Sequence, residues 1–134
     1  MKTKIVLAAI LLLGPGLALA ADSKLSLTGS EEVPAVETAA TGSGSIKVAA
    51  DNSVTGSVKT KGIDGIAAHI HQAAMGKNGP PIISLEKTGD GVWSVPKDSK
   101  LTDAQLAAYK AGELYVNVHS AAHKNGEIRA QLKP

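Results

Sequence analysis

The sequence predicts an all-β protein, built as a sandwich or a barrel with one short helix near residues 102–111. Short segments of strand-forming residues follow one another through most of the chain. Turn-forming residues separate them at close intervals, as in Asp51-Asn52, Gly89-Asp90-Gly91 and Asn125-Gly126. Because no linker, repeat or low-complexity run divides these segments, we expect a single domain.

Residues 1–20 have the features of a signal peptide and are not expected to belong to this domain. Lys2 and Lys4 precede the apolar run 5–13, and Ala18-Leu19-Ala20 has the small-x-small pattern of a cleavage site. The apolar run is too short to span a bilayer, which needs about 20 residues. Cleavage would leave residues 21–134 as one periplasmic or secreted domain without a membrane attachment.

Eight strands are expected, each of a few residues with turn signals around it: 24–28, 44–49, 53–60, 66–71, 81–86, 91–95, 114–119 and 127–132. One segment departs from this pattern. Thr102 and Gln105 form a capping box, helix-favouring residues follow, and Gly112 suits a left-handed helix end. We expect a single helix whose Leu106 and Tyr109 cover one end of the core.

Alternation along three strands predicts which side chains share a face. The residues expected in the core are Ile66, Ala68, Ile70, Leu114, Val116, Val118, Ile128, Ala130 and Leu132. The opposite faces then carry His69, His71, Tyr115, Asn117, His119, Glu127, Arg129 and Gln131, and we expect these faces to meet solvent. Three of the four histidines and the only arginine of the chain fall on this polar set.

The spacing of the histidines indicates a metal site. His69 and His71 lie two residues apart on one strand, so their Cβ atoms are about 6.5–7 Å apart and both rings can reach one ion. His119 is the best third ligand, and His123 or Met75 would complete the shell; thioether with imidazole suits Cu(I). The alternative is an exposed pair of histidines that binds nothing.

Composition narrows the classes of partner. Cysteine is absent, which excludes disulfides and thiolate metal sites. The chain has 14 basic and 12 acidic residues, so removal of Lys2 and Lys4 leaves 12 of each and no net charge. With one Trp, two Tyr and no Phe, the domain lacks the basic, aromatic surface that nucleic-acid binding requires.

Other polar residues allow more than one interpretation. Glu31 and Glu32 could be ligands, but a solvated turn beside Pro34 is preferred. Arg129 is either an anion guide next to the site or the partner of Glu127 or Glu113 in an ion pair. Ser120 follows His119 directly, yet no acidic residue is placed to complete a hydrolytic triad.

Three segments carry a family resemblance: "TGSEEVPAVETAATGSGSIKV", "AAHIHQAAMGKNGPPIISL" and "LTDAQLAAYKAGELYVNVHSAAHKNGEIRAQL". Together they resemble the CHRD domain, which is named after chordin and also occurs alone in exported bacterial proteins. The resemblance covers about residues 24–134. Ala130 stands where the family usually has Gly, and His123 is not a fixed part of the pattern, which puts a four-histidine site in doubt.

The resemblance implies an immunoglobulin-like or Greek-key β-sandwich that is similar to copper/zinc superoxide dismutase. In that enzyme a His-x-His strand, a later Val-His and a downstream arginine follow in the order of His69, His71, His119 and Arg129. This chain lacks the zinc loop, the bridging histidine and the disulfide of the enzyme. We therefore expect copper binding for copper handling or tolerance rather than catalysis.

Two alternatives stand beside copper binding. Because chordin uses the domain in growth-factor antagonism, the resemblance also allows a protein-binding module without metal, in which the histidines brace neighbouring strands. The lesser alternative is superoxide dismutation by a copper-loaded form. Copper binding through neutral imidazoles should weaken as the pH falls through about 6.5, the ordinary pKa of histidine.

Overall fold

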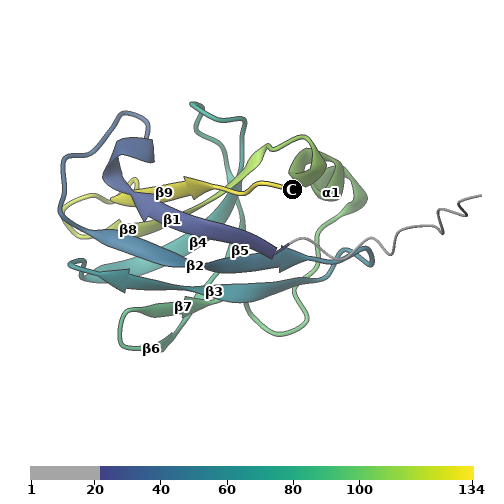
Figure 1. Ribbon diagram of the computed structural model, residues 1–134, viewed down its shortest axis with the longest axis horizontal. Helices are drawn as coiled ribbons and strands as arrows, with labels where there is room; N and C mark the ends of the chain where they lie inside the picture. Colours follow the sequence, from purple (N-terminus) through teal and green to yellow (C-terminus); the bar gives the residue numbers. More distant parts are fainter. Residues whose placement is uncertain (1–21) are drawn as a thin grey trace, which may run out of the picture.

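The computed structural model describes residues 22–134, so the expected signal peptide at 1–20 lies outside the described residues. The described elements follow in this order: β1 (Asp22–Thr28), the 3-10 turn η1 (Gly29–Glu31), β2 (Thr41–Val48), β3 (Val54–Lys61), β4 (Gly65–Gln72), β5 (Pro81–Ser84), β6 (Glu86–Gly89), β7 (Val92–Ser94), α1 (Asp103–Lys110), β8 (Leu114–Ser120) and β9 (Ile128–Gln131). The predicted all-β fold with one short helix is confirmed (Figure 1).

The strands form one antiparallel sheet in the order β5-β4-β8-β9-β1-β2-β3-β7-β6, which folds over and nearly closes on itself. Strands β1, β2 and β3 lie on one side and β4, β8 and β9 on the other (Figure 1). The sides are joined at one edge by the pairing of Thr28 with Arg129. At the other edge the chain passes from β5 to β6 through buried Leu85, whose N–H donates to Ala68 O at 2.9 Å.

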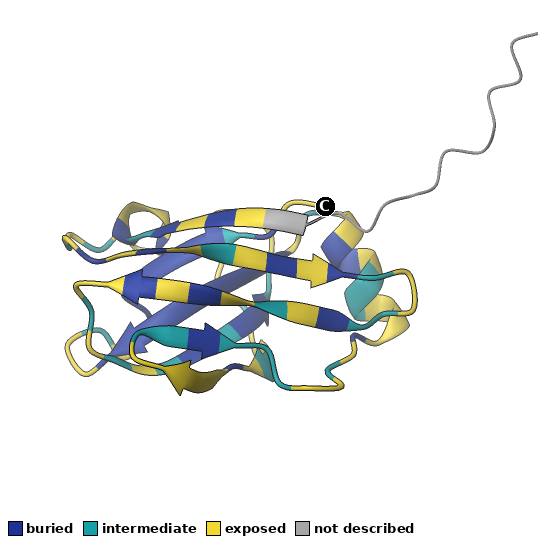
Figure 2. Ribbon diagram, turned by 60° about the horizontal axis from the view of Figure 1, so that its bottom comes forward, coloured by how far each residue is buried: buried dark blue, intermediate teal, exposed yellow. Residues whose placement is uncertain are grey.

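The hydrophobic core fills the space between the two sides of the sheet. Strands β1, β2 and β3 contribute Leu27, Ile46 and Val58, and the opposite side contributes Val116 and Ile128, all fully buried. Buried and exposed residues alternate along β2 and β3, which therefore face water on one side (Figure 2). Every residue of β8 is buried, so both faces of this strand are covered.

The helix forms as its sequence predicts. Thr102 Oγ1 accepts from the Gln105 N–H at 3.1 Å, and Gln105 Oε1 accepts from the Thr102 N–H at 2.9 Å. Gly112 follows the helix with a φ of 76°, the left-handed conformation that ends helices. Tyr109 is buried and Leu106 packs against the core, so the helix covers part of the core as expected.

Three expectations about individual segments are wrong. The predicted strand 81–86 is two strands, because the chain turns at Leu85 from one side of the sheet to the other. Ile66 was expected in the core but is 57% exposed, since the pairing of β4 with β8 shifts register between Gly65 and Ala67. Such a bulge interrupts the alternation from which the inward position of Ile66 follows. Strand β2 also begins earlier than expected, at Thr41.

Candidate metal centre

The polar face of β4, β8 and β9 is covered, contrary to the expectation that it meets solvent. Register places His69 opposite Asn117 and His71 opposite Tyr115, and Asn117 also faces Arg129 on β9. His71 and His119 are only 8% exposed, and Asn117 and Arg129 only 2%. The predicted assignment of side chains to this face is therefore correct, and the predicted solvent exposure is wrong.

Two loops cover this face: residues 29–40 after β1 and residues 73–80 after β4. Asn78 of the second loop joins it to the first, because its Nδ2 donates to Val33 O at 2.7 Å. Its Oδ1 accepts from Arg129 of β9 at 3.0 Å, which ties this loop to the sheet. Gln131 of β9 donates to Ala73 O at 3.0 Å. These bonds join positions that are tens of residues apart in the chain, and strand periodicity contains no information about them.

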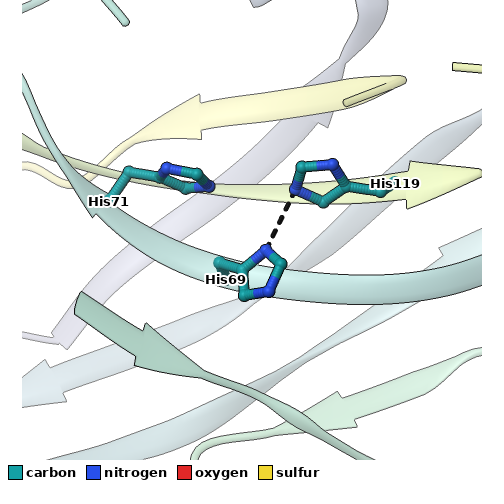
Figure 3. Close-up of side chains that lie close together, drawn as sticks. All are labelled: His69, His71 and His119. Atoms are coloured by element: carbon teal, nitrogen blue, oxygen red, sulfur yellow. Dashed lines mark hydrogen bonds between the residues drawn. The ribbon is translucent and has the colours of Figure 1, made fainter. Parts of the chain in front are cut away.

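Three imidazole rings meet on the covered face. His69 and His71 come from β4 and His119 from β8, and the rings turn toward one another (Figure 3). His69 Nδ1 lies 3.1 Å from His119 Nε2, and one ring nitrogen from each histidine lies within 4.8 Å of the others. Nitrogens that share an ion at about 2 Å are at most about 4 Å apart, so a pair separated by 4.8 Å would have to close by at least roughly 0.8 Å.

Backbone carbonyls set the protonation of two of these rings. His71 Nδ1 donates to Gly79 O at 2.9 Å, and His119 Nδ1 donates to Lys124 O at 2.7 Å. Each ring therefore keeps its lone pair on Nε2, and His119 Nε2 accepts the hydrogen bond from His69 Nδ1. His71 Nε2 is buried without a hydrogen-bond partner. A carbonyl that orients the far ring nitrogen is typical of histidines that bind metal.

The surroundings favour the neutral form of His69 and His71. Burial lowers the pKa of His69 below its ordinary value, and the neighbouring His119 and His71 lower it further. Burial also lowers the pKa of His71, against the opposing effect of its hydrogen bond to Gly79. Since only neutral imidazole offers a lone pair to a metal ion, His71 is ready to bind at neutral pH, and His69 becomes so once the proton on its Nδ1 moves to its Nε2.

Arg129 holds the covering loop in place and does not face solvent. Its guanidinium lies 3.4 Å from the centre of the Tyr115 ring and donates to Lys77 O at 2.6 Å as well as to Asn78. Tyr115 in turn stacks on His71 with the ring centres 4.7 Å apart. The bonds that Glu127 accepts come from Thr38 and Ser120 rather than from Arg129. Neither the expected ion pair with Glu127 nor a solvent-facing anion guide matches this arrangement.

The two residues expected to complete the shell lie apart from the histidine cluster. Met75 is 64% exposed and borders a surface hollow together with Lys24 and Gln131. In the described part of the chain, the cluster of potential ligands comprises His69, His71 and His119 and does not include His123. His123 instead borders a different hollow between the loops. Neither residue is brought to the three rings.

Glu32 is a feature of this region that the sequence interpretation missed. Its neighbour Glu31 is exposed, as expected for a solvated turn, but Glu32 is only 6% exposed. Burial raises the pKa of Glu32 to about 7, although Asn117 and Arg129 act in the opposite direction. Nothing in the local sequence distinguishes the two glutamates, because their difference depends on how the loop lies against β8 and β9.

The fold and the site together define a small antiparallel β-protein with a buried three-histidine cluster that is suited to hold a metal ion. The chain belongs to the CHRD domain family, whose model matches residues 24–132. Comparison found no significant match among curated proteins or among solved structures. Over the described residues, every helix is too short or too polar to cross a membrane.

Proposed function

We propose that this protein is an exported copper-binding protein that uses His69, His71 and His119 as ligands in copper handling or tolerance. The observation that carries the proposal is the convergence of three imidazoles, two of them with their Nε2 lone pairs set by backbone carbonyls. The export signal at 1–20, a periplasmic location and the sandwich likeness to copper/zinc superoxide dismutase are parts of this proposal.

The chemistry of the donor set favours copper among the ions available to such a site. Imidazole suits zinc, copper, iron and nickel, and Cu(II) binds most tightly in the usual order of divalent ions. When bound, copper would supply a redox-active centre with coordination positions beyond the three rings. The chain's own residues hold the rings at the centre and exclude water from His71 and His119.

Titration of the purified domain with Cu(I) and Cu(II) tests the proposal. We expect one tightly bound equivalent in the wild type and in His123→Ala, which removes a histidine outside the cluster. The double variant His69→Ala/His71→Ala should lose this equivalent while keeping its β-sheet circular dichroism. Unchanged stoichiometry in the folded double variant would refute the proposal. A folded wild type that binds no metal would favour a protein-binding CHRD module.

The pH dependence of binding offers a second test at the same site. Protons compete with the metal for the ring nitrogens, so affinity falls at low pH. Because burial lowers the pKa of His69 and His71, protons compete at these two rings only below the ordinary value of 6.5. Glu32 is another group of this region whose pKa is near 7. A fall in affinity that begins well above pH 7, and that persists when Glu32→Gln removes this group, would contradict this account.

A further inference from the structure

Unsatisfied acceptors gather beside the histidine cluster. Among the side chains that the structure describes, three buried atoms have no hydrogen-bond partner: Glu32 Oε2, His71 Nε2 and Asn117 Oδ1. Buried polar atoms are rarely left in this state, because each one costs about 1–3 kcal/mol in lost hydration. Their presence at one place indicates a proton or a cation that the region is built to receive.

Asn117 connects the carboxyl group to the histidines. It lies on β8 directly opposite His69, and its side-chain amide interacts with both His71 and Glu32. Glu32 and Asn117 converge on the backbone of Gly126, where any Cβ would collide with Glu32 Oε2 and Asn117 Nδ2. Asn117 thus lies between Glu32 and the histidine cluster, and Glu32 does not belong to the group of potential ligands.

The buried, unpaired Oε2 of Glu32 favours a proton on this carboxyl group when metal is absent. His71 Nε2 and Asn117 Oδ1 are acceptors, and an ionised Glu32 would add another acceptor to them. Asn117 Nδ2, which lies toward Glu32 Oε2 at Gly126, can donate to the carboxyl group in either state and offsets only part of the cost of burying a charge there. Burial, the largest influence on Glu32, also favours the neutral form and raises its pKa to about 7.

The charged groups around Glu32 do not neutralise a carboxylate. Arg129 of β9 attracts it, but the described hydrogen bonds of this guanidinium go to Lys77 and Asn78. His123 and Lys124 of the β8–β9 loop border the same hollow as Glu32. The buried carboxyl group of Glu127, which follows this loop, accepts hydrogen bonds from Thr38 and Ser120. On the side of Asn117 the facing groups are the histidines of the cluster, and burial favours the neutral form of His69 and His71. A divalent ion among them would be the largest positive charge in the region.

We propose that Glu32 carries a proton while the histidines are free of metal and releases it to solvent when they bind a divalent cation. This inference rests on the proposed function. The step is a simple ionisation: the O–H bond of the carboxyl group breaks, the carboxylate remains, and the proton passes to solvent. The hollow of about 270 Å³ that Glu32 shares with His123 and Lys124 gives the proton a route out. Glu32 is a positioning residue that couples metal affinity to pH.

Isothermal calorimetry with Cu(II) at pH 7 in two buffers of different ionisation enthalpy measures the protons released per ion bound. A group with a pKa of about 7 is half protonated at this pH, so the wild type should release about half a proton more than Glu32→Gln. Glu31→Gln, which changes the exposed neighbouring carboxyl group, should behave like the wild type. Equal proton release in the wild type and a folded Glu32→Gln variant would overturn the inference.

A second measurement needs no substitution at Glu32. The side-chain carboxyl carbon of Glu32, followed by NMR, should titrate near pH 7 without metal and at least one pH unit lower with diamagnetic Zn(II). A midpoint near 4.5 in both states, or an unchanged midpoint, would refute the inference. A wild type that takes up neither Cu(II) nor Zn(II) would refute the proposed function as well, whereas metal uptake without a shift refutes the role of Glu32 alone.

Discussion

Replacement of Glu32 by glutamine should make the protein more stable once the pH rises above 4.5, and most of all at neutral and alkaline pH. Glutamine has nearly the same shape as a protonated glutamate and cannot ionise. The substitution therefore removes the cost of burying a carboxylate while it preserves the packing against Gly126 and Asn117. The exposed Glu31 gives a matched control, because Glu31→Gln makes the same chemical change at a solvated position.

The size of the effect follows from the pKa of Glu32. Folding raises this pKa from 4.5 to about 7, so the folded state holds the proton more tightly than the unfolded state. Stability from the neutral form is fully present below pH 4.5 and is lost as the pH rises through 7. At about 1.4 kcal/mol per pH unit the loss reaches about 3 kcal/mol by pH 8. Because the carboxyl group borders an open hollow, solvent screening reduces the expected value to about 1–3 kcal/mol.

Urea denaturation of the metal-free proteins at pH 4.5 and pH 8 measures this difference as a change in the midpoint at constant slope. We expect the wild type and Glu32→Gln to have free energies of unfolding within about 0.5 kcal/mol at pH 4.5. At pH 8 the variant should be the more stable by about 1–3 kcal/mol, and Glu31→Gln should follow the wild type at both values. A Glu32→Gln variant that is less stable than the wild type at pH 8 would show that the carboxylate is well solvated or paired, and the reasoning would fail.

Three further substitutions test other parts of the structure. Arg129→Met should cost about 2–4 kcal/mol by urea denaturation, because it removes two charge-assisted hydrogen bonds and a cation–π contact. It should also speed amide hydrogen exchange in residues 73–80, and unchanged exchange would show that Arg129 does not hold this loop. Gly126→Ala should cost more than about 2 kcal/mol, since Gly126 has a φ of 119° and a Cβ would displace Glu32; a neutral result would mean that the loop readily moves. Thr102→Ala should lower the free energy of unfolding by about 1 kcal/mol through loss of the capping box and leave metal stoichiometry unchanged. Altered stoichiometry would contradict the inference that the helix takes no part in the metal site.

Local patterns in the sequence were sufficient to predict the histidine cluster but not its environment. Strand alternation placed His69 and His71 on one face, and the same rule on another strand placed His119 on a face of the same kind. The pairing of β4 with β8 then brought the faces together. The expectation failed at Ile66, where a shift of register interrupts the alternation and leaves an apolar side chain exposed.

The sequence by itself determined most of the strands, the capped helix and the sharing of a face by the histidines, because each depends on interactions within a few residues along the chain. The tertiary structure alone decided that this face is buried. The loops over it are held by contacts between distant residues, such as Arg129 with Asn78 and Asn78 with Val33. Burial by those loops lowers the pKa of His71 and raises that of Glu32, since the free energy of a charge depends on everything packed around it.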